Sequence, residues 1–89
     1  MKAVITVIGK DTVGIIAKVA TLCAEYSANI EDITQSVLKD YFAMIMLANI
    51  DGLTSDFSTF VDALAKLGAE NKLEIRAMHE DIFDAMHTI

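Results

Sequence analysis

Residues 7–17 have the sequence VIGKDTVGIIA, in which a strand-like pattern changes within a few positions to a helical one. Residues 2–8 are mostly β-branched and apolar, which predicts a strand buried on both faces. A glycine interrupts that pattern, and from Val13 the apolar residues recur at helical spacing. Asp11 or Thr12 is the expected N-cap, because either side chain can accept hydrogen bonds from the free N–H groups of a helix.

Two amphipathic helices are predicted by their apolar stripes. The stripe of the first, which ends near residues 27–29, consists of Ile15, Val19, Leu22 and Tyr26, with Ile16 and Cys23 beside it. The stripe of the second consists of Phe57, Phe60, Val61, Leu64 and Leu67. We expect Thr54 or Ser55 to cap the second helix, and Gly68 and Asn71 to end it.

Three further strands are predicted from runs of β-branched and apolar residues. Residues 30–38 and 41–50 flank a tight turn at Lys39-Asp40 and should form a hairpin, and residues 73–78 form the last strand. The order β-α-β-β-α-β predicts an α+β, ferredoxin-like sandwich with a four-stranded antiparallel sheet. Right-handed crossovers place both helices on one face and give the strand order four-one-three-two.

The polarity of the strands agrees with that order. The first and third strands are apolar on both faces, as central strands should be, and the polar residues of the other two strands identify them as edges. These polar residues are Glu31, Asp32, Gln35, Ser36, Glu74 and Arg76. An edge strand offers unpaired backbone groups, so it is a natural docking place for a second chain. Thr34 and Gln35 are expected to be exposed edge residues, with a place in an interface pocket as the alternative.

The chain divides into a domain of residues 1–78 and an amphipathic tail helix of residues 79–89. One side of the tail carries Ile82, Phe83, Met86 and Ile89, while Glu80 and Asp81 at its start and His87 near its end suit the helix dipole. The two main helices cover only one face of the sheet. We therefore expect the tail to help cover the other face, in its own chain or in a partner's.

Composition points to a small domain that associates with a second chain. Of the 89 residues, 54% are hydrophobic, which is more apolar surface than one small core should hold. No apolar run is long enough to span a membrane, and no secretory leader is evident, so we expect a cytoplasmic protein. The net charge of −6 and the scattered Lys and Arg residues argue against nucleic-acid binding.

Residues that could carry metal or catalytic chemistry are few. Cys23 is the only cysteine and lies on the buried stripe, so it is expected to be a core residue. His79 and His87, with Glu80 and Asp81, lack the spacing of a metal site and are expected to be solvated. No set of nucleophile, base and acid is suggested. We therefore predict no enzyme, no metal and no cofactor.

The start of the first helix is the strongest candidate binding site. Its free N–H groups and positive dipole end suit a ligand carboxylate, and Gly14 lacks a side chain that would keep a ligand from the backbone. Asp11 could receive an ammonium group, and Asn29 can both donate and accept hydrogen bonds. The alternative roles are structural: a helix cap for Asp11, a packing point for Gly14 and a turn for Asn29.

Residues 7–17, together with Asn29-Ile30, resemble the ACT domain, and the resemblance covers residues 1–78. The tail resembles that of small stand-alone bacterial ACT proteins. The resemblance implies two chains paired side by side into an eight-stranded sheet, with an amino acid bound at the interface and a metabolic enzyme or transcription under regulation. It implies ligand contacts at Asp11, Val13 and Gly14, with Thr12 between them, and at Asn29 from the neighbouring chain.

We therefore expect a regulatory, small-molecule-binding module that senses an amino acid at the interface of a homodimer or higher homo-oligomer. A regulated protein partner is a further expectation, whereas a nucleic-acid or membrane partner is not. The alternative is a ligand-free module for dimerisation or protein–protein interaction. It differs from the first expectation in having no amino-acid response.

Overall fold

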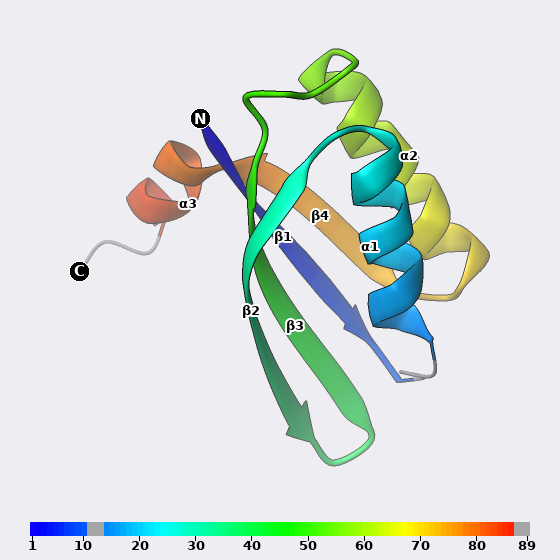
Figure 1. Cartoon of the computed structure of the whole chain (residues 1–89). Coiled ribbons are helices and arrows are strands. Elements are labelled where there is room, and N and C mark those ends of the chain that lie inside the picture. The colour runs from blue at the N-terminus through cyan, green and yellow to red at the C-terminus, as the bar shows by residue number, and fades with distance from the viewer. Residues whose placement is uncertain (11–13, 87–89) are drawn as a thin grey trace.

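The computed structural model describes residues 1–10 and 14–86. The elements follow in the order β1 (Lys2–Gly9), α1 (Ile15–Glu25), β2 (Asn29–Leu38), β3 (Tyr41–Asn49), α2 (Phe57–Glu70), β4 (Glu74–His79) and α3 (Glu80–Met86) (Figure 1). The predicted β-α-β-β-α-β order is confirmed, and each of these strands and helices lies within a few residues of its expected position.

The four strands form one antiparallel sheet in the order β2-β3-β1-β4, which confirms the predicted ferredoxin-like topology. β1 is central, and its Ile5 lies opposite Met46 of β3 and Ala77 of β4. β2 and β4 are the edges, as their polar residues indicate.

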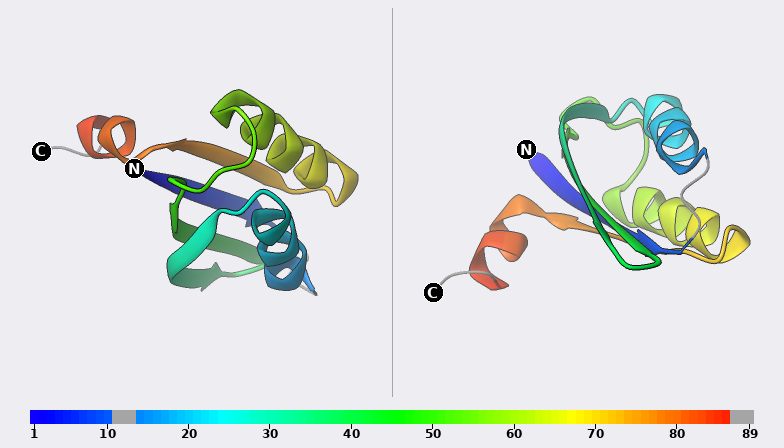
Figure 2. Two further views of the ribbon diagram at one scale, coloured as in Figure 1. Left: turned by 45° about the horizontal axis from the view of Figure 1, so that its top comes forward. Right: turned by 90° about the horizontal axis from the view of Figure 1, so that it is seen from below.

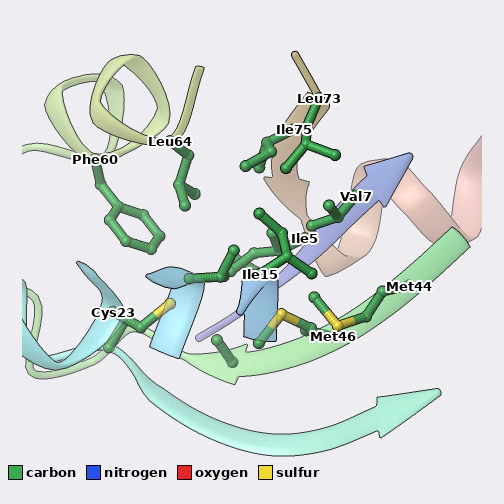
Figure 3. Packing of buried hydrophobic residues seen from close by; sticks show 14 of the residues in the cluster. Ile5, Val7, Ile15, Cys23, Met44, Met46, Phe60, Leu64, Leu73 and Ile75 are labelled. Carbon is green, nitrogen blue, oxygen red and sulfur yellow. The ribbon is translucent and has the colours of Figure 1, made fainter. Parts of the chain in front are cut away.

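The core lies between one face of the sheet and the helices α1 and α2, which lie together on that face (Figures 1 and 2). β1 contributes Ala3, Ile5 and Val7, and β3 contributes every second residue from Phe42 to Ala48. Figure 3 shows how the side chains of α1, α2 and the sheet meet in this layer. The rings of Tyr26 and Phe60 join the two helices, with their centroids 5.6 Å apart.

Both helices begin later than the sequence pattern suggests, and both predicted caps are wrong. The N-cap of α1 is Gly14 rather than Asp11 or Thr12, and its φ of 71° is the left-handed conformation that glycine adopts at little cost. The N-cap of α2 is Asp56 rather than Thr54 or Ser55. The Ser55 hydroxyl donates instead to the Asp56 carbonyl, at 3.0 Å.

Gly68 was predicted to end α2. It lies inside the helix instead, where the helix approaches β4 most closely. A Cβ atom at Gly68 would lie 2.7 Å from the carbonyl oxygen of Leu73. The helix ends at Glu70, and the side-chain amide of Asn71 donates to the carbonyl of Leu67 at 2.8 Å. Ile16 of α1, which was placed beside the apolar stripe, is 36% exposed.

The other face of the sheet is covered at one end only. Val4 alternates with the core residues of β1, so it lies on this face, and it is 5% exposed. Ile8, on the same face at the other end of β1, is 49% exposed. α3 contacts β1 and β4, and the right view of Figure 2 shows the strands between it and the two longer helices.

α3 leaves part of its own apolar surface exposed, since Ile82 and Met86 are 51% and 65% exposed. His87 and Ile89, which were expected to extend this helix, lie outside the described residues. Across residues 1–10 and 14–86, no helix combines the length and the hydropathy that a bilayer crossing requires.

Candidate functional site

The predicted binding site lies where β1 ends and α1 begins. Asp11, Thr12 and Val13 are outside the described residues, so the geometry of the site rests on its two flanks. On the β1 side, Gly9 packs so tightly on Leu73 that an added Cβ would lie 2.0 Å from a Leu73 methyl carbon. On the α1 side, the Gly14 carbonyl accepts the first helical hydrogen bond, from the N–H of Lys18 at 3.1 Å.

The start of α1 is open to solvent. Gly14 is exposed, and among the described residues no side chain caps the helix and no atom lies within 4 Å of where a Cβ at Gly14 would be. The first N–H groups of an α-helix have no partner within the helix, and together with the helix dipole they attract anions. This end of α1 can therefore hold a carboxylate, whereas a packing role for Gly14 is not supported by its surroundings.

Asn29 lies at the opposite end of the same helix. It begins β2, is exposed, and pairs with Asn49 of β3 beside the first residues of β1. Gly14 begins α1 and Asn29 follows its end, and a helix of 11 residues is about 16 Å long. One chain therefore does not bring Gly14 and Asn29 together.

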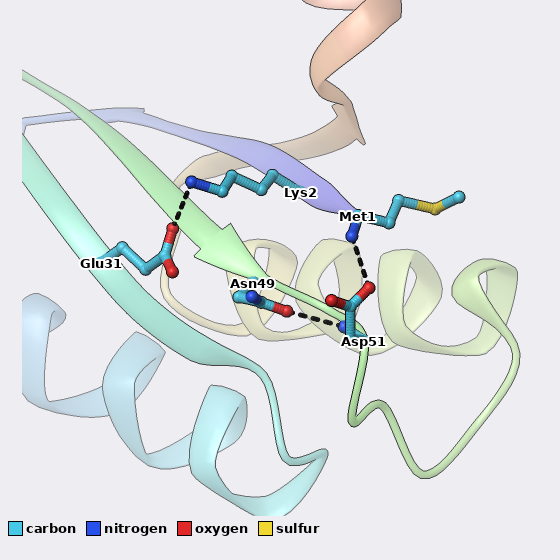
Figure 4. A network of polar contacts seen from close by, with 5 residues as sticks. All are labelled: Met1, Lys2, Glu31, Asn49 and Asp51. Atoms are coloured by element: carbon cyan, nitrogen blue, oxygen red, sulfur yellow. Dashed lines mark hydrogen bonds and ion pairs between the residues drawn. The ribbon is translucent and has the colours of Figure 1, made fainter.

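Polar contacts fix the backbone around Asn29 (Figure 4). Lys2 forms an ion pair with Glu31 at 2.9 Å, and the hydrogen bond and charge of Glu31 raise the pKa of Lys2. The N-terminal ammonium pairs with Asp51, whose backbone N–H donates to the side-chain oxygen of Asn49 at 2.9 Å. The start of β1 is thereby tied to β2 and to the loop after β3.

β2 is an open edge. Residues 31–37 are all exposed, although β2 pairs with β3 along its length. Ile33 and Val37 lie opposite the core residues Met46 and Phe42, hence on the helix side of the sheet, yet they are 37% and 71% exposed. The helix layer of one chain therefore stops short of β2. Thr34 and Gln35 are exposed on this strand, as expected.

Three hollows in the surface lie away from Gly14 and Asn29. One, of about 480 Å³, lies between the start of β1 and α3 and is lined by Met1, Lys2 and residues 79–82. A second, of about 490 Å³, lies between α2 and β4, and a third, of about 400 Å³, lies between α1 and α2. Gly14 and Asn29, the two residues of the predicted site that the structure describes, line none of the three.

The other cysteine and histidine side chains that the structure describes pack against neighbouring residues. The prediction that Cys23 is a core residue is confirmed, because it is 1% exposed and burial raises the pKa of its thiol to about 11. The His79 ring stacks on Phe57, with the ring centroids 4.2 Å apart. Among the described residues, no three His, Cys, Asp or Glu side chains gather closely enough to hold a metal ion.

Comparison with known proteins gives the family. Residues 2–78 match the family model of the ACT domain. A UPF0237 protein of Methanococcus maripaludis is 50% identical over 86 residues, which cover 97% of this chain and 96% of that protein. An ACT domain protein of Streptococcus pneumoniae, of known structure, is 39% identical with a TM-score of 0.82, and the match covers 98% of each chain.

The chain belongs to the ACT domain family, a class of regulatory domains that typically bind small molecules. The regulatory subunit of aspartate kinase from Thermus thermophilus is 28% identical, with a TM-score of 0.65, and the match covers 86% of this chain and 50% of that one. ACT domains commonly bind amino acids and form dimers.

Proposed function

We propose that this protein is an amino-acid-sensing regulatory module that acts as a homodimer, with each ligand site built from two chains. The observation that carries the proposal is the placement of Gly14 and Asn29 at opposite ends of α1, next to an open edge strand. The family relationship supports the ligand class, because ACT domains commonly bind amino acids.

The direction of β2 supports the two-chain site. β2 runs from Asn29 to the turn at Lys39, which lies at the same end of the sheet as Gly9 and the β1–α1 loop. If the β2 strands of two chains pair antiparallel about a two-fold axis, the start of each strand lies beside the end of the other. Asn29 of each chain then approaches the β1–α1 loop of its partner.

The exposed apolar residues of β2 support the same pairing. Ile33 and Val37 lie on the helix side of the sheet, beyond the cover that α1 of their own chain provides. Side-by-side pairing continues both the sheet and its helix layer, which removes these side chains from water. Burial of a Val or Ile side chain contributes about 1.5–3 kcal/mol, so two such residues per chain favour association.

In the proposed site, the N–H groups at the start of α1 bind the ligand carboxylate, and Asp11 binds its ammonium group. Gly14 lets the carboxylate approach the helix, and Thr12 and Val13 are further proposed contacts on the strength of the family resemblance. Asn29 of the partner closes the site with one donor and one acceptor. A ligand bound by both chains stabilises the dimer, and that coupling is the means of regulation.

A thermal-shift screen against the common amino acids tests the proposal. A ligand present at about 100 times its dissociation constant adds about 2.7 kcal/mol, which raises the melting temperature of a domain this size by about 10 °C or more. Asp11→Ala should abolish the shift, whereas Asp62→Ala, at an exposed aspartate on α2, should retain it. A flat response to every amino acid would favour the ligand-free interaction module instead.

A mixing experiment tests whether two chains form the site. Asp11→Ala and Asn29→Ala should each bind nothing alone. A mixture should regain about one quarter of the sites, because each mixed dimer contains one site with both wild-type residues. No recovery on mixing, with both variants folded and dimeric, would place the site within one chain.

A further inference from the structure

The outer edge of β4 is open to the addition of another strand. β4 pairs with β1 on one side only, so alternate residues direct their backbone N–H and C=O groups away from the sheet. The hollow of about 490 Å³ between α2 and β4 is lined by every residue of β4 from Glu74 to Met78. Because successive residues of a strand point to opposite faces, this groove follows the edge of the sheet rather than one face.

α2 leaves the edge of β4 accessible. Val61, Ala65 and Ala69 line the helix side of the groove, and their spacing of four places them in one row along the helix. The two alanines are exposed, so this row places no long side chain over the edge. β4 contains no proline, and its register with β1 is continuous, so it lacks two of the devices that protect edge strands from pairing.

The side chains of β4 make it complementary to a second copy of itself. Glu74 and Arg76 lie on the face opposite the helices, and Ile75 lies between them on the core face. In an antiparallel pair with its two-fold axis at Ile75, each Glu74 lies directly opposite the partner's Arg76. In one chain Arg76 donates to its own Glu74 at 2.5 and 3.1 Å, so pairing joins two exposed ion pairs into four alternating charges.

We propose that β4 pairs antiparallel with β4 of a second copy of this chain, in the register that sets Glu74 opposite the partner's Arg76. A two-fold axis at either charged residue would instead place two like charges opposite each other, which destabilises a strand pair. A strand that fits this edge needs an acid, an apolar residue and a base in that order, and β4 itself supplies them. The contact is separate from β2 pairing and does not depend on the proposed ligand site.

The order of the charges, rather than the area, selects the partner. β4 is six residues long, so the paired surface is small and the association is weak and reversible. Backbone hydrogen bonds between the two strands hold it, and the exposed charges set its register. Because those charges are open to solvent, the association should weaken as the salt concentration rises.

Sedimentation of charge variants gives the first test. All proteins carry Gln35→Lys, which opposes pairing at β2, so that a rise in mass with concentration reports on another contact. Glu74→Arg and Arg76→Glu should each stay monomeric, because four like charges then meet at the axis. Their equimolar mixture should form a dimer, because every opposed pair then has opposite charges.

The circular dichroism spectrum of each variant should match that of the Gln35→Lys parent, since both charged side chains are exposed. A parent that stays monomeric at about 1 mM would overturn the proposal. So would single variants that associate as strongly as the parent, or a mixture of the two that remains monomeric.

Disulfide trapping in the wild-type background tests the register. A mixture of Glu74→Cys and Arg76→Cys should give a covalent dimer on mild oxidation, because the two positions are opposed and Cys23 is buried. Either variant alone should give little, since two copies of the same position lie about 8 Å apart across the axis. A mixture of Glu74→Cys with Ala24→Cys on α1 is the control and should give none. Equal yields from the single variants, or no product from the mixture, would leave this edge to a strand of another protein.

Discussion

Gly68 shows how a single side-chain atom can outweigh helix propensity. Alanine is favoured over glycine inside a helix by about 1 kcal/mol, so sequence alone predicts that Gly68→Ala stabilises the protein. The structure reverses the sign, since the added Cβ would lie 2.7 Å from the Leu73 carbonyl oxygen and 3.1 Å from an Ile75 side-chain carbon. We expect Gly68→Ala to lower the free energy of unfolding by about 1–3 kcal/mol in urea titrations.

Gly52→Ala is the matched control for that comparison, because a Cβ there meets only the Ser27 carbonyl oxygen, at 3.5 Å. Its free energy of unfolding should stay within about 0.5 kcal/mol of the wild-type value. Equal effects of the two substitutions would show that the close contact at Gly68 does not set the spacing of α2 and β4.

At Gly14, the effect of a substitution depends on the backbone conformation rather than on the space around the residue. A Cβ there has open surroundings, but the φ of 71° is strained for most L-residues. We expect Gly14→Val to lower the melting temperature, whereas Gly14→Asn should lower it less, since asparagine tolerates left-handed φ. The asparagine variant therefore allows ligand binding to be measured without loss of the helix start. Equal melting temperatures for both variants would contradict the assigned backbone conformation.

Cys23 should make the free energy of unfolding decrease at alkaline pH. Its pKa is raised by burial from 9.0 to about 11, so the folded state holds the thiol proton more tightly than the unfolded state. The resulting stability is fully present below pH 9 and is lost as the pH rises toward about 11. Thermal melts between pH 8 and 11 should show this decline, and the same decline in Cys23→Ala would assign it to other groups.

At the scale of the elements, much of this fold follows from sequence pattern and some does not. The hairpin, the edge strands and the central β1 are predictable because apolar periodicity reports which faces are buried. The helix caps are not, because Ser, Thr and Asp side chains near a helix start do not reveal which residue leaves the helical conformation. The positive φ values of Ser27, Lys39 and Lys72 give no sequence signal either.

The candidate site was predictable only in part, because a sequence pattern locates each element but not its position relative to the others. The change from strand to helix pattern places Gly14 at a helix start, and Asn29 is placed at the start of β2 by the same kind of evidence. Their separation along α1 depends on the direction of the helix over the sheet. A sequence pattern fixes each element, but the assembly of a site from two chains requires the spatial arrangement.

α3 should protect Val4 in its own chain. Val4 lies on the sheet face at the end of β1 that α3 contacts, so deletion of residues 80–89 should expose it and lower the free energy of unfolding by about 2 kcal/mol. If α3 covers Val4, Val4→Thr should cost stability in the full chain but little in the truncated one. Additive losses in urea titrations would mean that α3 stabilises the fold elsewhere.

For the whole molecule, the β2 interface and the amino-acid response should be lost together. A lysine on an exposed edge strand opposes strand pairing, so Gln35→Lys should weaken the β2 dimer and the amino-acid response. Sedimentation and thermal shifts on the same preparations give both readings, and an amino-acid response that survives the loss of the dimer would place the site within one chain.

The central place of β1 has a consequence for how the chain is made. Within this domain β1 is synthesised before β3 and β4, with which it forms hydrogen bonds, and β4 is the last strand of the sheet. Until β4 has emerged from the ribosome, β1 has one bare edge and the core lacks Ile75. Folding is therefore completed only when the whole domain is free, and nascent chains that stop early remain targets for chaperones and proteases.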